Sequence, residues 1–348
     1  MNSYLMTERL WVPVRSVLVT MMLVILAPTT SAMQTAEQVV QRDYVWLTAE
    51  QPSGSQTVKV FADGRVSVHF KYNDRGRGPD TTTDMKFDAD GVLASYASRG
   101  VNHMKGSVDE RFEIRRGRAV WSSSLERGEA SATPRKLYFP VNHPPEYWAA
   151  LIRAALVRPD RRIELLPAGI AQVTDVASLA LAVEGVSRTA TLYEIAGLDI
   201  APTYVWLDER GELVGYGAGW FSILRTQWIS HLSVLRSAQK QALDERIRAE
   251  TVRFRQRVEA PIAIAGVRIL DVRSGRLTEP VTVLLRDGLI AGIDATGAIV
   301  PTEAHRIEGG GKTLMAALWD LHGHIDPSVY LNYIASGVLN VRDMGNEP

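Results

Sequence analysis

Two histidines separated by one residue, His322 and His324, stand at the end of an apolar run that begins near Thr313. If that run is a β-strand, both imidazoles project from the same face, because side-chain direction repeats every two residues. Neutral imidazole is a common zinc ligand, so the pair could share one metal ion. Asp320 would lie on the same face, where a carboxylate either orients a metal-bound histidine or is purely structural. A pair of solvated or core histidines is the alternative interpretation.

The order of the segments around this histidine pair favours one of these two interpretations, the metal site. Compact hairpins over residues 262–293 come first, and the Gly-Gly-Gly-Lys segment at 309–312 leads into the apolar run. Residues 337–338 and 341–345 follow the histidines. Over about a quarter of the chain, this order resembles the opening of the amidohydrolase superfamily. The sequence departs from that family at residues 316–317, which are Ala-Ala where Pro-Gly is usual.

The resemblance implies a fold and a chemistry. The hairpins would form a small β-sandwich, and the histidine pair would end the first strand of a (β/α)8 barrel. His322 and His324 would be paired ligands of zinc or another divalent metal, with one or two ions in a full-length relative. The implied reaction is hydrolysis of a carbon–nitrogen bond in a small amide or cyclic amide by metal-activated water.

The length of the chain limits this expectation. A (β/α)8 barrel needs about 250 residues, whereas the chain has 348 residues in all, of which 90 follow Val258. A catalytic zinc site takes three protein ligands, and the resemblance supplies two. We therefore expect a truncated reading frame, no complete catalytic set, and an inactive polypeptide.

Composition excludes several other chemistries. The chain has no cysteine, which excludes disulfide frameworks, thiolate metal sites and cysteine nucleophiles. Its 39 basic and 39 acidic side chains give no net charge, which argues against a nucleic-acid partner. With 46% apolar and 22% charged residues, most of the chain is expected to fold.

The first 32 residues predict a secretory signal peptide. Arg9 and Arg15 precede a ten-residue apolar stretch, and small residues at 30–32 would allow cleavage before Met33. The stretch is shorter than the roughly 20 residues of a spanning helix, although an uncleaved anchor remains the alternative. We expect a periplasmic or secreted protein with no stable membrane insertion after cleavage.

The segment after the signal is rich in strand patterns. Residues 44–130 alternate apolar and polar side chains, and the Asp-Gly pairs at 63–64 and 90–91 predict β-hairpins. Residues 146–157 predict a helix that follows two prolines. Residues 222–258 predict a connecting helix with a highly charged end.

These patterns predict four successive parts: a signal peptide (1–32), a leader domain (33–221), a connecting helix (222–258) and an amidohydrolase-like segment (259–348). The leader would be an α+β domain built on antiparallel sheet. The last segment would hold the small β-sandwich and the first strands of the incomplete (β/α)8 (TIM) barrel.

A non-catalytic hypothesis is also open, in which the leader is a periplasmic β-rich module that binds an apolar ligand or a partner on a curved sheet. Aromatic residues on alternating strands would line such a concavity, although these are more often ordinary core. They are Trp46, Phe61, Phe70, Phe87, Phe112 and Trp121.

Two glycine-rich segments lack a nucleotide signature. Gly311-Lys312-Thr313 lacks the earlier glycine of a phosphate loop, and Gly215-x-Gly217-x-Gly219 has the wrong interval for a dinucleotide loop.

Overall fold

The computed structural model describes residues 37–89, 91–132, 136–199, 201–295, 299–325 and 329–345. The predicted signal peptide at 1–32 lies outside these ranges, as do Asp90 of the second predicted turn and the last three residues of the chain. Within the described ranges, none of the helices combines the length and the apolar character needed to span a membrane.

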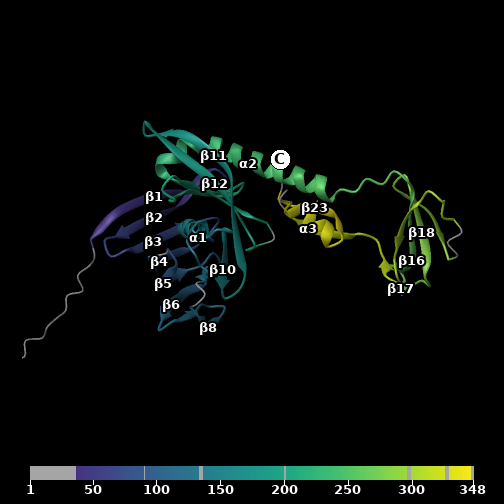
Figure 1. Ribbon diagram of the computed structural model, residues 1–348, viewed down its shortest axis with the longest axis horizontal. Helices are drawn as coiled ribbons and strands as arrows, with labels where there is room; N and C mark the ends of the chain where they lie inside the picture. Colours follow the sequence, from purple (N-terminus) through teal and green to yellow (C-terminus); the bar gives the residue numbers. More distant parts are fainter. Residues whose placement is uncertain are drawn as a thin grey trace, which may run out of the picture. The chain divides into compact units, whose positions relative to one another are not determined.

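Fifteen strands form one continuous sheet between residues 38 and 225 (Figure 1). They are β1 (Gln38–Thr48), β2 (Gln51–Phe61), β3 (Arg65–Tyr72), β4 (Asp80–Phe87), β5 (Leu93–Val101), β6 (Ser107–Arg115), β7 (Arg118–Ser122), β8 (Arg127–Ser131), β9 (Leu137–Tyr138), β10 (Arg162–Leu166), β11 (Ile170–Val183), β12 (Val186–Ala196), β13 (Thr203–Asp208), β14 (Leu213–Ala218) and β15 (Phe221–Arg225). Their spatial order is β8-β7-β6-β5-β4-β3-β2-β1-β15-β14-β13-β12-β11-β10-β9. Neighbours are antiparallel except β9 and β10, so the sheet consists of two meanders joined between β1 and β15.

Local turn chemistry accounts for the meanders. β2 and β3 pair antiparallel across the predicted Asp63-Gly64 turn, where Gly64 has φ of +78° and its N–H donates to Phe61 O at 2.9 Å. Only glycine adopts such a φ without steric cost. β4 and β5 also pair antiparallel around the second predicted turn. Both predicted hairpins are confirmed.

The strand β15 corrects the predicted connecting helix. Residues 222–225 lie in this strand, where Ile223 is opposite Trp46 of β1, so the helical part begins later than Ser222. A 3₁₀ turn, η1 (Thr226–His231), precedes helix α2 (Leu232–Phe254). The apolar residues Leu224, Trp228 and Leu235 therefore lie in three different elements, β15, η1 and α2.

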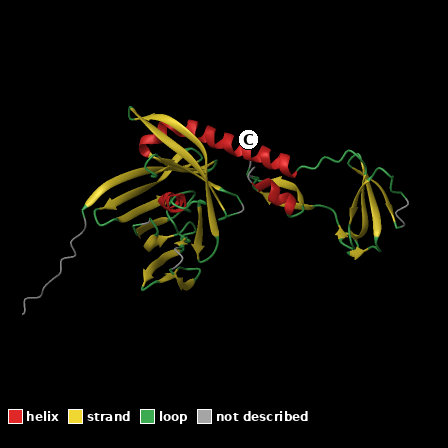
Figure 2. Ribbon diagram, in the orientation of Figure 1, coloured by secondary structure: helices red, strands yellow, loops and turns green. Residues whose placement is uncertain are grey.

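Helix α1 (Glu146–Leu156) packs against one face of the sheet, which we call the α1 face (Figure 2). Nine of its eleven residues are buried, and the helix contacts β10, β11, β13 and β14 in one core cluster that includes Ile163, Val173 and Leu213. The helix was predicted at 146–157 and is confirmed there. Its first residue, Glu146, is 3% exposed and its carboxylate lies 3.0 Å from the Arg42 guanidinium.

A buried charged cluster fixes the start of α1 on the sheet. Besides Glu146, Arg42 also contacts Glu212 at 2.9 Å, and the Tyr44 hydroxyl donates to Leu213 O at 3.0 Å. The Gln56 side-chain oxygen accepts a hydrogen bond from the Glu146 backbone N–H at 3.1 Å. Because a buried charge is tolerated only when paired and hydrogen-bonded, this cluster specifies where the helix begins.

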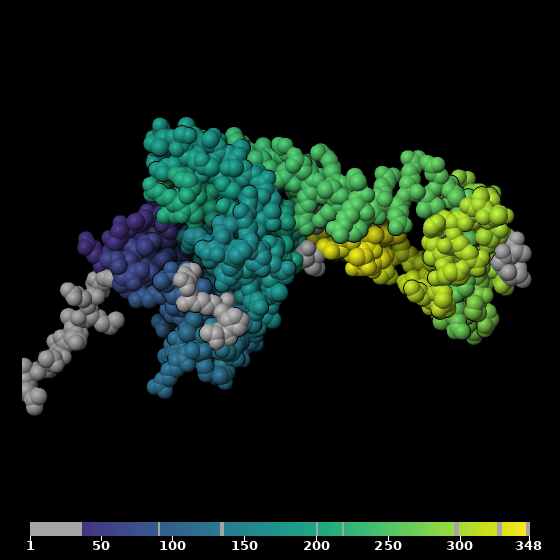
Figure 3. All heavy atoms as spheres, viewed as in Figure 1, coloured from purple at the N-terminus to yellow at the C-terminus, as the bar shows by residue number. Residues whose placement is uncertain are grey.

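Helix α2 covers part of the opposite face, which we call the α2 face (Figure 3). Trp206, Val214 and Leu224 of the sheet form a second core cluster with Trp228 of η1 and Leu235 of α2. Only Leu235 and Gln239 of the 23 residues of α2 are buried. This helix is therefore a partial cover and not an internal element.

The remaining elements form two small sheets. The first contains β16 (Ile262–Asp271), β17 (Arg276–Leu277), β18 (Val281–Arg286), β19 (Leu289–Asp294), β20 (His305–Glu308) and β21 (Thr313–Leu314). The second pairs β22 (Leu318–Gly323) with β23 (Val338–Asp343) in parallel, with helix α3 (Tyr330–Ala335) between them in sequence.

The predicted fold class is wrong. The described residues show a mostly β structure dominated by the 15-stranded sheet, and no (β/α)8 pattern is present among them. The prediction failed because one strand–helix–strand unit, here β22, α3 and β23, is locally the same in many α/β folds. A barrel requires that unit to repeat around a closed ring, which the described part of the chain does not show.

Candidate functional site

The structure places the two predicted metal ligands side by side. His322 lies in β22 and His324 follows it, with ring centroids 5.6 Å apart and ring planes 25° apart. Asp320 accepts a hydrogen bond from the His322 backbone N–H at 3.0 Å, and the Tyr333 hydroxyl donates to it at 3.5 Å. Both histidines are exposed. Asp320 therefore holds the local backbone, and its contacts are not with the imidazoles.

The expectation of a metal-binding hydrolase is not supported by the residues around this pair. Among the described residues, no group of three or more His, Cys, Asp or Glu side chains is arranged to hold a metal ion. The assignment of His322 and His324 as zinc ligands is tested by nothing further in the structure and stays a prediction.

The aromatic residues of the non-catalytic hypothesis belong to the core on the α1 face. Four of them, Trp46, Phe70, Phe112 and Trp121, are buried at 8% exposure or less. Phe87 packs against the same core, and the Arg65 guanidinium lies 3.8 Å from the centroid of the Phe61 ring. Because α1 packs among these side chains, they serve the fold and are not a free apolar surface.

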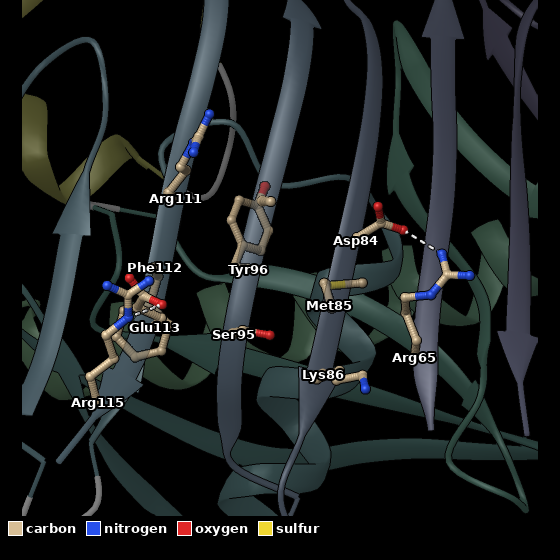
Figure 4. A pocket seen from close by; sticks show the side chains of 11 residues that line it. Arg65, Asp84, Met85, Lys86, Ser95, Tyr96, Arg111, Phe112, Glu113 and Arg115 are labelled. Atoms are coloured by element: carbon tan, nitrogen blue, oxygen red, sulfur yellow. Dashed lines mark hydrogen bonds and ion pairs between the residues drawn. The ribbon is translucent and has the colours of Figure 1, made fainter. Parts of the chain in front are cut away.

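A shallow hollow of about 310 Å³ lies over strands β3 to β6 (Figure 4). The short side chain of Ser95 lies opposite Lys86 and Glu113 in the strand register, which leaves the gap. The charges around it pair locally, with Arg65 at 3.0 Å from Asp84 and Arg115 at 2.5 Å from Glu113. Exposed ion pairs of this kind are typical of a solvated surface.

A larger hollow of about 580 Å³ lies beside α2. It is lined by Ala49 and Glu50 from the β1–β2 turn, by Gly219 from the β14–β15 turn, and by Arg236, Gln239, Lys240 and Leu243 from α2. A narrow inner end continues between α2 and strands β13 to β15, where Arg236 and Gln239 line it again together with Gly215 and Gly217. We call the two hollows together the α2 cleft.

Two glycines of β14 line the inner end of this cleft. Gly215 lies opposite Leu224 in the register, and Gly217 lies opposite Ser222. A Cβ at Gly215 would approach Ile223 O to 2.4 Å, and Gly217 has φ of +95°. Side chains are therefore excluded from both positions. Neighbouring atoms of β15 take up this space, and the inner end of the cleft has a volume of only about 10 Å³.

Arg236 links the helix to the two turns at the mouth of the cleft. Its guanidinium forms an ion pair with Glu50 and donates to the Ser222 hydroxyl at 3.1 Å. The Ala49 N–H donates to Trp220 O at 2.8 Å, which joins the turns to each other. Ala49 and Glu50 have φ of +45° and +65°, a conformation that is rare outside glycine, Asn and Asp.

Gln239 gives the cleft its distinctive chemistry. The residue is 8% exposed, yet its side-chain amide has no hydrogen-bond partner among the described residues. A glutamine amide carries two donors and an acceptor, and buried polar groups in folded proteins are nearly always hydrogen-bonded. The Gln239 amide still reaches solvent, whereas Nε of Arg236, on the same helix, is fully buried and has no hydrogen-bond partner in the described structure.

Sequence reasoning did not identify these residues. Gln239 lies in a charged helix, where one more polar residue gives no signal in the sequence. The ion pair of Arg236 is with Glu50, which is 186 residues away. The one available signal was the run Gly215-x-Gly217-x-Gly219. Its interval does not fit a dinucleotide loop, and nothing else in the sequence explains these alternate glycines. Alternate glycines in a strand mark a place where something approaches the backbone closely.

Comparisons with known proteins identify no family. No family model matches the chain, and no curated protein matches it. One similar solved structure is described as a β-barrel-like protein of the domain of unknown function DUF1849 from Brucella abortus, at 15% identity, covering 55% of this chain and 96% of that one, with a TM-score of 0.37. Another is a DUF1089 family protein from Pseudomonas aeruginosa, at 15% identity, covering 48% and 91%, with a TM-score of 0.30.

These findings correct the predicted resemblance to the amidohydrolase superfamily, which is wrong. No family model, of amidohydrolases or of any other family, matches the chain. The local pattern that suggested it, strand–His-x-His followed by a helix and a strand, is real in the structure but does not specify a family.

Proposed function

We propose that the region 37–254 is a non-catalytic binding module that takes a small polar molecule in the α2 cleft. The observation that carries the proposal is the cleft itself, together with Arg236 in its lining, whose buried Nε has no hydrogen-bond partner in the described structure. The volume of about 580 Å³ is within the range of small-molecule sites, about 300–1,000 Å³. The predicted signal peptide supports placing this binding outside the cytoplasm.

A binding role is favoured over a catalytic one by the kinds of group that line the cleft. Its charged side chains are Glu50, Arg236 and Lys240, and the first two neutralise each other. No Ser, Cys or His lines either hollow next to a second group that would activate it as a nucleophile. These side chains can hold and orient a ligand.

The test is a ligand-observed NMR screen of the full chain against pooled amino acids, short peptides, monosaccharides and nucleosides. We expect at least one class to bind and to be recovered chemically unchanged. Leu243→Trp, which places a large side chain at the cleft, should abolish that binding. Absence of binding by every class, or binding that Leu243→Trp does not affect, would contradict the proposal.

The matched control is Val252→Trp, because Val252 lies on the same helix, is 82% exposed and does not line the cleft. This variant should bind as the unmodified chain does. Conversion of a bound compound into a product by the purified chain would show that the module is an enzyme.

A further inference from the structure

The charged groups at the mouth of the α2 cleft indicate the chemical class of its ligand, an inference that rests on the proposed function. We infer that the ligand is a small organic acid whose carboxylate replaces that of Glu50 on the Arg236 guanidinium. Without a ligand, Glu50 occupies the carboxylate position itself. Binding therefore exchanges one carboxylate for another.

Arg236 already holds a carboxylate at the mouth of the cleft. Its guanidinium forms an ion pair with Glu50, and both residues line the larger hollow. The planar N–H donors of a guanidinium match the two oxygens of a carboxylate. The side chain of Glu50 is 69% exposed, whereas that of Arg236 is 21% exposed. The arginine is therefore the anchored member of the pair, and the carboxylate is the member that can leave.

The turn that carries Glu50 is held in an unfavourable conformation. Thr48 and Gln51 lie opposite each other in β1 and β2, so Ala49 and Glu50 form a two-residue hairpin loop. Both loop residues have positive φ, which favours Asn and Gly at these positions over Ala and Glu. Residues in such a conformation persist only where their surroundings hold them. The ion pair with Arg236 is one contact that holds Glu50, so its exchange releases a constraint on the turn.

The donors of Arg236 are not all satisfied while Glu50 is in place. The guanidinium also donates to the Ser222 hydroxyl at 3.1 Å, but Nε has no hydrogen-bond partner in the part of the chain that the structure describes. A free acid is not tethered to the turn, so it can bind side-on, with one oxygen on Nε and the other on an Nη. Because Nε is enclosed, this pairing requires the guanidinium to turn, which the departure of Glu50 allows.

The other lining groups favour an acid with a small apolar body. Lys240 lies one helical turn after Arg236, and its ion-pair partner Asp244 is not part of the lining. Leu243 provides an apolar wall. When Glu50 leaves, two cations and no anion remain among the described lining side chains. A hollow with this balance of charge attracts an anionic ligand.

The first experiment measures the binding of succinate to the full chain by titration calorimetry, beside succinamide and inorganic phosphate. Succinamide has nearly the shape of succinate but no charge. We expect succinate to bind more tightly than succinamide by about tenfold or more, because the amide forms no charged pair with Arg236. Equal binding of succinate and succinamide, or tighter binding of phosphate than of succinate, would overturn the assignment of a carboxylate ligand.

A substitution of Glu50 tests the exchange itself. Glu50→Gln removes the competing carboxylate, so succinate should bind about two- to fivefold more tightly, the range expected for loss of an exposed ion pair. If the pair of Glu50 with Arg236 is purely structural, the variant should bind succinate equally or more weakly, and that result would overturn the inference.

Glu129→Gln is the matched control for this variant. It makes the same change of charge and breaks an exposed ion pair with Arg118, but Glu129 lies in β8 and does not line the cleft. Its affinity for succinate should equal that of the unmodified chain. Thermal unfolding of both variants shows whether they are folded.

A second measurement uses the unmodified chain. The Nε–H signal of Arg236 is followed in a ¹⁵N-edited NMR spectrum and assigned by its absence in Arg236→Lys. Succinate should shift this signal in a saturable way, and succinamide at the same concentration should not. Binding of succinate without movement of the Arg236 signal would place the acid elsewhere on the molecule and overturn the inference.

The outcomes separate this inference from the proposed function. If galactose or adenosine binds, Leu243→Trp abolishes that binding and succinate does not bind, the organic-acid inference is overturned and the binding module stands. If succinate binds and Leu243→Trp leaves its affinity unchanged, the acid site lies outside the cleft and the inference is again overturned. If none of these compounds binds at millimolar concentration, both the inference and the proposed function are wrong.

Discussion

The two long faces of the 15-stranded sheet each carry one helix, and the two helices are used in opposite ways. On the α1 face, nine of eleven helical residues are buried and Glu146 is held in a paired charged cluster. On the α2 face, two of 23 residues are buried, and one of them, Gln239, has an amide without a partner among the described residues. The first contact buries most of its helix, and the second leaves a cleft.

The difference supports placing the proposed binding on the α2 face. A well-packed interior leaves few voids larger than a water molecule, and most of α1 is packed in this way. The α2 face combines a hollow with Arg236, whose buried Nε has no partner in the described structure, and such a group is a cost to folding unless binding offsets it. The comparison therefore predicts that substitutions on the α1 face change stability, whereas those at the α2 cleft change binding.

The largest expected effect comes from the charged cluster at the start of α1. Glu146→Gln should reduce the free energy of unfolding by about 3 kcal/mol or more, because it leaves the Arg42 charge incompletely paired in a buried site. Asp244→Asn on α2 is the matched control, since its pair with Lys240 is exposed and should be worth less than about 1 kcal/mol. Urea unfolding measures the free energy of unfolding of both variants. Equal losses in the two variants would contradict the proposed difference between the α1 and α2 faces.

The next effect is a pH dependence on the α1 face. Burial lowers the pKa of His143 from 6.5 to about 4, and the ring lies between Phe139 and Trp148. Between those pH values the unfolded chain binds a proton that the folded chain does not, so stability falls as the pH falls. A shift of this size corresponds to a loss of about 3 kcal/mol in the free energy of unfolding, and the loss is complete below about pH 4.

His143→Phe should remove this slope between pH 6.5 and 4, as measured by urea unfolding at a series of pH values. His69→Gln serves as the control, because His69 is exposed beside Asp80. If the slope of the His143→Phe variant equals that of the unmodified chain, His143 is not buried in the neutral form.

The smallest effect compares two buried glutamines, one on each face. Gln56→Leu should cost about 1 kcal/mol, because the lost acceptor of the Glu146 backbone N–H outweighs the removal of Gln56 Nε2, which is buried without a partner in the described structure. Gln239→Leu should change the free energy of unfolding by less than about 0.5 kcal/mol, because its amide reaches solvent. Denaturation midpoints measure both, and a loss at Gln239 equal to that at Gln56 would mean that Gln239 is structural.

Local elements of the fold were predictable from the sequence, whereas their assembly was not. The Asp63-Gly64 turn specifies a hairpin through its own backbone, and Glu146–Leu156 is helical by its apolar spacing. The pairing of β1 with β15 joins residues about 180 positions apart, as the Thr226 hydroxyl bonded to Asp43 O illustrates. No local pattern encodes such a contact, so residues 222–225 were assigned to the following helix.

The candidate site was less predictable still. His322 and His324 were expected to lie together, and the structure places their rings 5.6 Å apart. A site formed by a hollow gives a weaker signal in the sequence, because the position of Gln239 in the cleft is visible only when the packing around it is known. The alternate glycines of β14 were visible, but their meaning depends on the helix that passes over them.

The central claim is tested most directly by the side-chain amide signals of Gln239 in a ¹⁵N-edited NMR spectrum, assigned by their absence in Gln239→Leu. N-acetyl-dialanine, galactose and adenosine are added in turn to the full chain. The account predicts that the Gln239 amide signals shift in a saturable way with at least one of the three compounds, while those of Gln56 do not move. If none of the three compounds moves the Gln239 signals, the α2 cleft is not a binding site.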